Sequence, residues 1–222
     1  MNLSPAAWAR ILPFLLFLGL LAVRGLMADL GWLDARWIYA LNLLLVGGLL
    51  AWSWRGFGEL HRQNRPQGRE WLWSVGVGLA VFVAWIHLDA PWMQIGEPTA
   101  PFVPTQPDGR LDWPLIAVRW LGATALVPVM EELFWRSFVM RWLEHPQFES
   151  VPPQRVTIKP VLMATFAFML VHPLWLAAIV AGVAYAWIYV HTGRLWNAVI
   201  AHAVTNGALG LWVVATGNWQ FW

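Results

Sequence analysis

The fold of this chain is decided by one long apolar stretch, PLIAVRWLGATALVPVMEELFWRSFVMRWL, which covers residues 114–143. A helix needs about 20 predominantly apolar residues to cross a lipid bilayer, and this stretch is longer than that. Charged groups inside a membrane are costly, so each one is a candidate for function. The charged residues well inside this stretch are Arg119, Glu131, Glu132 and Arg136.

Further apolar stretches lie on both sides of this segment. The region 160–190 is divided into two short spans at His172-Pro173, because proline disrupts helical hydrogen bonding. The other predicted spans are approximately 8–27, 37–54, 71–88 and 195–215. We therefore predict an all-α fold, a polytopic transmembrane bundle of about seven spans that forms a single membrane domain over residues 1–222.

The composition excludes several classes of protein. Hydrophobic residues make up 59% of the chain and charged residues only 12%, whereas a soluble domain carries about 25% charged residues. The 19 Trp residues are typical of side chains that favour the headgroup zone of a bilayer. The absence of Cys excludes disulfides and thiol catalysis, and a net charge of +2 indicates no nucleic-acid partner.

Basic residues predict the orientation of the bundle. With a cytoplasmic N-terminus, nine Lys and Arg residues fall in cytoplasmic segments and two in external ones, as the positive-inside rule requires. The external two are Arg36 and Arg110, and the cytoplasmic nine are Arg10, Arg55, Arg62, Arg65, Arg69, Arg141, Arg155, Lys159 and Arg194.

The two adjacent carboxylates of the long span have different expected roles. Glu132 and Arg136 are four residues apart and can pair on one helix face. Glu131 points about 100° away from Glu132. We therefore interpret Glu131 as the carboxylate that remains free for another task.

Two other spans carry polar groups to a similar depth. His172 lies at the proline break, and His202 and Asn206 are four residues apart on one side of the last span. At a rise of about 1.5 Å per residue, these groups and Glu131 lie about 12–20 Å from the basic flanks of their helices. A single buried His or Asn often only bonds a neighbouring helix, but the matched depths favour one water-filled site.

The motifs EExxxR, FxxxH and HxxxN, in this order within membrane spans, resemble those of the CAAX-protease and bacteriocin-processing superfamily of intramembrane endopeptidases. The resemblance covers about residues 114–206, the motif-bearing core. The stretch EELFWRSFVMRWL and the chain end GNWQFW also resemble a bacterial branch found beside exosortase-type protein-sorting systems. The matching positions are Glu131, Glu132, Arg136, Phe168, His172, His202 and Asn206.

The resemblance implies an endopeptidase that hydrolyses a peptide bond of a membrane-associated protein. It makes Glu131 the general base, with His172 helping to hold and polarise the water, and it implies no cofactor. His202 and Asn206 can donate hydrogen bonds to a developing oxyanion. Glu132, Arg136 and Phe168 would support the site. The bacterial branch further implies the bacterial inner membrane, a substrate with a C-terminal sorting segment and an exosortase-type partner system.

Three alternatives remain at this point. A zinc-dependent protease could use His172, His202 and one Glu as ligands, although the sequence has no HExxH motif. A non-catalytic scaffold is disfavoured because every motif residue is retained. A transporter that relays protons through buried charges would usually show repeated halves, and we find none in the sequence.

Overall fold

The computed structural model describes residues 3–30, 35–96 and 103–222. Within these ranges there is no named β-strand, only an isolated bridge between Thr105 and Leu111, so the predicted all-α fold is confirmed. The helices are α1 (Pro5–Leu30), α2 (Ala35–Ser53), α3 (Glu70–His87), α4 (Trp113–Leu121), α5 (Val127–Glu132), α6 (Arg141–Glu144), α7 (Ile158–Met169), α8 (Trp175–Thr192) and α9 (Leu195–Thr216).

The long central helix is continuous but not uniform. Between α4 and α6 the chain passes through two π-helical segments, η5 (Gly122–Leu126) and η6 (Leu133–Met140), so that one apolar helix runs from Trp113 to Glu144. In the described part of the chain, six helices are long and apolar enough to cross a membrane. The predicted spans agree with these helices to within a few residues at most ends.

One predicted span is shorter than a full crossing. The chain breaks at His172-Pro173 as expected, because α7 ends at Met169 and α8 begins at Trp175. The 12 residues of α7 extend about 18 Å, whereas the hydrocarbon core of a bilayer is about 30 Å thick. The described bundle therefore has six long apolar helices and one of about half that length.

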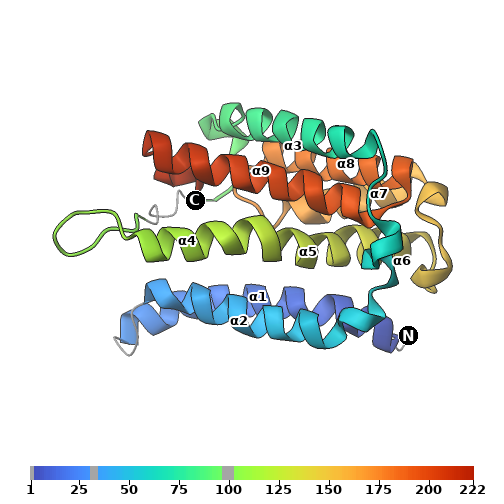
Figure 1. The fold of residues 1–222 in the computed structure, drawn as a ribbon, viewed down its shortest axis with the longest axis horizontal. Helices are drawn as coiled ribbons and strands as arrows, with labels where there is room; N and C mark the ends of the chain where they lie inside the picture. Colours follow the sequence, from blue (N-terminus) through green and yellow to red (C-terminus); the bar gives the residue numbers. More distant parts are fainter. Residues whose placement is uncertain (1–2, 31–34, 97–102) are drawn as a thin grey trace.

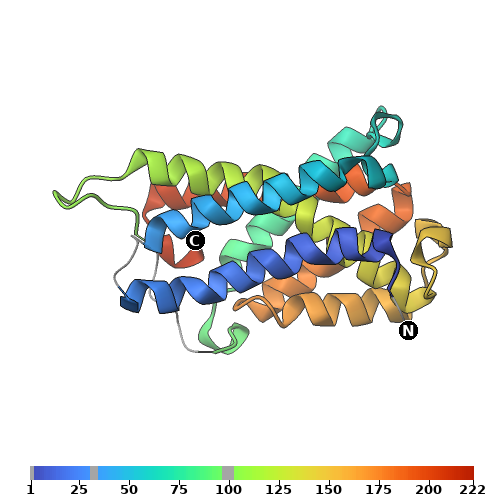
Figure 2. The ribbon, with the colours of Figure 1, turned by 90° about the horizontal axis from the view of Figure 1, so that it is seen from below.

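The central helix separates two groups of helices. Helices α1 and α2 pack together on one side of it, and α3, α8 and α9 lie on the other side (Figure 1). Helix α7 packs along α8 and also against η6, and it runs parallel to the long axis of the bundle (Figure 2). Both groups thus face the helix that carries the two adjacent glutamates.

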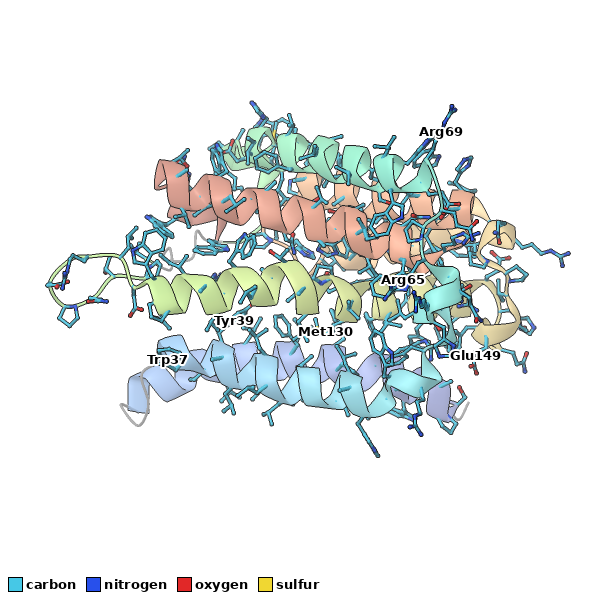
Figure 3. All side chains as sticks on the ribbon, in the orientation of Figure 1. Trp37, Tyr39, Arg65, Arg69, Met130 and Glu149 are labelled. Atoms are coloured by element: carbon cyan, nitrogen blue, oxygen red, sulfur yellow. The ribbon has the colours of Figure 1, made fainter. Side chains whose placement is uncertain are left out.

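The two ends of the bundle differ in charge. We call the end formed by residues 54–69, 145–157 and 192–194 the basic end. Figure 3 shows Arg65, Arg69 and Glu149 at this end, where the N-terminus also lies, and Trp37 at the opposite end. Exposed Trp side chains gather near both ends, as in an aromatic belt; they include Trp8, Trp52, Trp71, Trp73, Trp92 and Trp113.

A buried polar network ties the basic end together. Arg10 Nη2 donates to both carboxylate oxygens of Glu59 at 2.8 Å, and the Ser137 hydroxyl bonds the same carboxylate. Arg141 Nε donates to the Val151 carbonyl at 2.9 Å. Burial raises the pKa of Glu59, but Arg10 and Ser137 more than offset this effect, so the pKa lies below its usual value. The network joins α1, the loop 54–69 and the central helix.

Candidate active site

The central helix changes its hydrogen-bond pattern just before the two glutamates. The amide of Val127 donates to the Gly122 carbonyl, five residues back, which is the π-helical spacing. In this register the next donor would be residue 128, but Pro128 has no N–H. The carbonyl of Ala123 therefore lacks its helical donor.

Asn206 supplies the missing donor from the facing helix. Its side-chain Nδ2 donates to the Ala123 carbonyl at 2.9 Å. One turn closer to the start of the central helix, Trp120 Nε1 donates to the Gly207 carbonyl at 3.0 Å. These two bonds fix α9 against α4 and η5. The bond to Ala123 engages one of the two N–H groups that the Asn206 amide carries.

The predicted ion pair between Glu132 and Arg136 is present. Arg136 Nε lies 3.2 Å from Glu132 Oε2, and both side chains are almost fully buried. The guanidinium lies over the ring of Phe168, with its central carbon 4.7 Å from the ring centroid, and 5.5 Å from that of Tyr185. Arg136 Nη2 also donates to the Gly182 carbonyl at 3.4 Å. The pair thus connects the central helix to α7 and α8.

Glu132 has a second partner in His202. Nδ1 of His202 lies 2.9 Å from Glu132 Oε1. A carboxylate in an ion pair only accepts hydrogen bonds, so Nδ1 carries the hydrogen. The Tyr185 ring stacks on the imidazole at 4.9 Å with an interplanar angle of 18°. The Tyr185 hydroxyl donates to Thr205 Oγ1, which donates on to the Gly78 carbonyl. The orientation of His202 is therefore fixed from two sides.

Glu131 has very different surroundings. Its side chain is 8% exposed, and among the described residues nothing donates a hydrogen bond to its buried Oε2. It lies close enough to His172 and to Tyr39 of α2 to interact with both electrostatically. Buried polar atoms are rarely left without a partner. This carboxylate is therefore placed to receive a water or a substrate group.

His172 is oriented by its own helix. Its Nδ1 lies 2.8 Å from the Phe168 carbonyl, and a carbonyl oxygen only accepts, so Nδ1 carries the hydrogen and the neutral ring keeps a lone pair on Nε2. The ring lies 4.2 Å from the Phe168 ring and meets the edge of Trp85 at 5.9 Å. This contact explains the spacing of the FxxxH motif, in which the Phe supports the His.

The turn that carries His172 is covered by the segment that follows α3. Trp175 Nε1 donates to the Trp92 carbonyl at 3.0 Å. The Ile95 amide donates to the Pro173 carbonyl at 2.8 Å. Residues 91–95 thus hold the turn between α7 and α8 in place.

Some buried polar atoms on the two glutamates and on Arg136 accept or donate no hydrogen bond within the described structure. They are Glu131 Oε2, Arg136 Nη1 and Glu132 Oε2, of which the last lies in the ion pair with Arg136 Nε. Such atoms are usually satisfied by ordered water or a ligand. In the described part of the chain, no three His, Asp or Glu side chains are grouped closely enough to hold a metal ion.

The comparison with known families identifies this region. Residues 113–208 match the family model described as type II CAAX prenyl endopeptidase Rce1-like. Over this segment, which is a little less than half of the chain, the sequence is similar to the Rce1-like family. The matched range nearly coincides with the motif-bearing core predicted at about 114–206, and it contains all of the predicted site residues. The chain matches none of the curated proteins and none of the solved structures with which it was compared.

The similarity to the Rce1-like family and the six apolar helices together indicate the class of protein. The chain is an integral membrane protein with a segment that is similar to a family of proteases. The predicted roles of single residues remain predictions. The structure brings Glu132, Arg136, Phe168 and His202 into one connected set. Glu131 and His172 lie beside this set, and Asn206 binds the central helix at η5, before the two glutamates.

Sequence reasoning missed the tyrosine and threonine that support the candidate site. Tyr185 stacks on His202 and bonds Thr205, yet neither residue was assigned a role in the predicted site. A signal was available, because the chain has only 3 Tyr against 19 Trp. All three tyrosines are buried in the structure. A rare Tyr within a membrane span indicates a hydroxyl that needs a partner.

Proposed function

We propose that this chain is an intramembrane endopeptidase that hydrolyses a peptide bond of a membrane-associated protein with water activated by Glu131. The observation that carries the proposal is the contrast between two neighbouring carboxylates. Glu132 bonds His202 through Oε1, and its Oε2 lies 3.2 Å from Arg136 Nε. Among the described residues, nothing donates a hydrogen bond to the buried Oε2 of Glu131 and no cation is paired with it. Adjacent acids with different surroundings can take different roles, one structural and one as a base.

The proposed first step uses Glu131 and His172 together. Glu131 accepts one proton from the water, while Nε2 of the neutral His172 ring accepts a hydrogen bond from the remaining O–H and orients the oxygen. The water oxygen then attacks the carbonyl carbon of the peptide bond. Glu131 returns its proton to the departing amine nitrogen, so the proton balance closes within the site.

The developing oxyanion needs donors, for which we propose His202 and Asn206. The second N–H of the Asn206 amide is suited to this role because the first is engaged by Ala123. Nδ1 of His202 is engaged by Glu132, so donation from Nε2 requires the doubly protonated ring. The Glu132 carboxylate at 2.9 Å supplies the negative charge that this ring would pair with.

The decisive experiment is the substitution Glu131→Gln, which preserves shape but removes the basic oxygen. The protein would be reconstituted in liposomes and given two peptides, one with a C-terminal sorting segment and one with a prenylated CAAX end. We expect cleavage to fall by about 10²–10⁴, the usual contribution of a general base, and His172→Ala to be similarly severe. Asn206→Ala should cost about 10²–10³, as in other oxyanion holes.

The matched control is Glu149→Gln, which changes an exposed carboxylate at the basic end and should leave cleavage unchanged. Folding of each variant would be checked by circular dichroism. If folded Glu131→Gln protein cleaves at the wild-type rate, the catalytic assignment is wrong. If wild-type protein cleaves neither peptide but moves protons across the liposome membrane, the transporter alternative takes its place.

A chelator separates the metal-free mechanism from the zinc alternative. If Glu131 and His172 activate water alone, a strong chelator leaves the cleavage rate intact. Loss of activity with chelator, restored by added zinc but not by buffer exchange, would favour a zinc enzyme instead. The rate would be measured with the same liposomes and with the peptide that is cleaved faster.

The preference for one of the two peptides also tests the resemblance to the bacterial branch that is found beside exosortase-type systems. We propose that the substrate carries a C-terminal sorting segment and that the protein acts in a bacterial inner membrane beside an exosortase-type system. The stretches EELFWRSFVMRWL and GNWQFW support this proposal. Preferential cleavage of the prenylated CAAX peptide would instead assign the protein to prenyl-protein processing.

A further inference from the structure

An apolar groove runs between α7 and α8 on the outer surface of the bundle. Its volume is about 370 Å³, and the residues that define it include Ile158, Val161, Val183, Ala186 and Val190. Three of these side chains come from α8, one of the long apolar helices. The groove therefore faces the acyl chains of a surrounding bilayer, well away from the face of α8 that holds Tyr185.

A polar pocket lies next to this groove at the basic end. Its volume is about 290 Å³, and Gln67, Arg69, Glu70 and Thr192 help to line it. His191 lines both the groove and the pocket. The two hollows are thus adjacent, one apolar and the other polar.

An aromatic stack separates the two hollows. The ring centroid of His191 lies 5.4 Å from that of Trp187 and 5.9 Å from that of Trp73, with interplanar angles of 10° and 19°. Trp187 lines the groove and Trp73 lines the pocket. Aromatic side chains of this kind mark the boundary between headgroups and acyl chains, so the stack lies where a lipid changes from polar to apolar.

The charge of the pocket favours an anion. Its one carboxylate, Glu70, already accepts from the Gln67 amide at 2.8 Å and lies 3.4 Å from Arg194 Nε. Arg69 is exposed and points outward at the top of the basic end (Figure 3). On the side of the groove, Lys159 follows Ile158 and is exposed as well. The described charges around the two hollows therefore sum to a positive value.

We propose that the groove and the pocket together bind one anionic phospholipid. The phosphate lies in the pocket near Arg69, and an acyl chain lies along Val161, Val183 and Val190. A free phosphate would use only the pocket, whereas the adjoining groove is shaped for an acyl chain. Anionic lipids collect around basic segments at a membrane surface. The bound lipid packs against both helices that flank the His172 turn and stabilises their association, independently of the reaction proposed at Glu131.

The test measures lipid binding rather than cleavage. Protein purified in detergent would be incubated with phosphatidylglycerol or phosphatidylcholine, and bound lipid would be counted by native mass spectrometry. We expect phosphatidylglycerol to bind more tightly and to raise the Tm. Arg69→Gln should weaken this binding by about fivefold, the effect of one basic residue near a membrane surface, whereas Arg62→Gln, in the same loop but outside the pocket, should not.

A second pair of variants tests the groove. Val183→Trp fills it, while Val180→Trp adds the same side chain one turn away, at a position that is also exposed and does not line the groove. We expect only Val183→Trp to abolish the tight binding. Equal binding of both lipids, or equal binding by the two Trp variants, would overturn the proposal. So would free inorganic phosphate that competes fully with the lipid, or a photo-crosslinker at position 183 that captures the cleaved peptide in place of lipid.

Discussion

Glu131 and Glu132 are neighbours in the chain, yet the helix sends their side chains to different partners. The pairing of Glu132 with Arg136 could be predicted from the sequence, because residues four apart share a helix face. The bond from His202 to Glu132 could not, because it depends on how α9 rotates against the central helix. The sequence therefore predicted which residues form the candidate site, but it did not predict which of them are hydrogen-bonded to one another.

The buried ion pair between Glu132 and Arg136 leads to a prediction about single residues. Removing one partner of a buried pair costs about 3–5 kcal/mol, because the other charge is left uncompensated. Arg136→Ala should therefore lower the thermal stability and the yield of the protein as well as its activity, measured by thermal unfolding in detergent. Arg62→Ala, at an exposed position of the loop 54–69, is the control and should melt like wild type. Normal stability of Arg136→Ala would contradict the structural role of the pair.

Helices α3 and α9 approach each other closely at one glycine. A Cβ atom on Gly78 would lie 2.7 Å from Val204 Cβ and would also collide with the Ala201 carbonyl. Small residues permit this kind of contact between membrane helices. It allows Thr205 Oγ1 to reach the Gly78 carbonyl at 2.8 Å, so the packing of two helices fixes a hydroxyl that supports Tyr185.

Substitution of this glycine gives a matched comparison within one helix. Gly78→Ala should destabilise the protein, because neither a helix backbone nor a β-carbon can move aside easily. Gly76→Ala meets no atom within 4 Å and should be neutral or stabilising by up to about 1 kcal/mol, the difference in helix propensity. Both variants would be compared by thermal unfolding. Similar melting temperatures would show that α3 and α9 can separate at low cost.

The sequence predicted the helices better than their internal irregularities. Apolar length located the spans, since hydropathy is a local property, and Pro173 located the break before α8. The π-helical turn at η5 was not predicted, although Pro128 offered a clue, because a proline in mid-helix leaves a carbonyl that needs another donor. The donor, Asn206, is 83 residues further along the chain than the Ala123 carbonyl that it bonds, and only the fold brings the two together.

At the scale of the whole molecule, helices α1 and α2 lie outside the segment that matches the family. They nevertheless interact with both halves of its central helix. Arg10 of α1 bonds Glu59 next to Ser137, and the ring of Tyr39 of α2 lies 5.3 Å from the guanidinium carbon of Arg119. Helices α1 and α2 therefore both interact with the central helix, or with the loop that bonds it, and a single membrane domain over the chain stays a prediction.

The orientation of the bundle is tested with reporters. The loop 54–69 carries Arg55, Arg62, Arg65 and Arg69, so the positive-inside rule predicts that it lies in the cytoplasm together with the N-terminus. Fusions of alkaline phosphatase and of a fluorescent protein after Gln67 and after Asp108 should report opposite sides of the membrane. Both fusions on the same side would refute the topology.

The π-helical turn at η5 also bears on how related chains should be aligned. A turn closed between residues five apart contains one residue more than a turn closed between residues four apart, so η5 accommodates one surplus residue without disturbing the α-helix on either side. A relative with a single deletion within 122–126 would still present both glutamates in the same directions. As long as Pro128 is retained, the carbonyl four residues before it would still lack a helical donor, because proline has no N–H. We therefore expect relatives with a single-residue gap between 123 and 128 to keep a hydrogen-bond donor at the position of Asn206 wherever they keep Pro128.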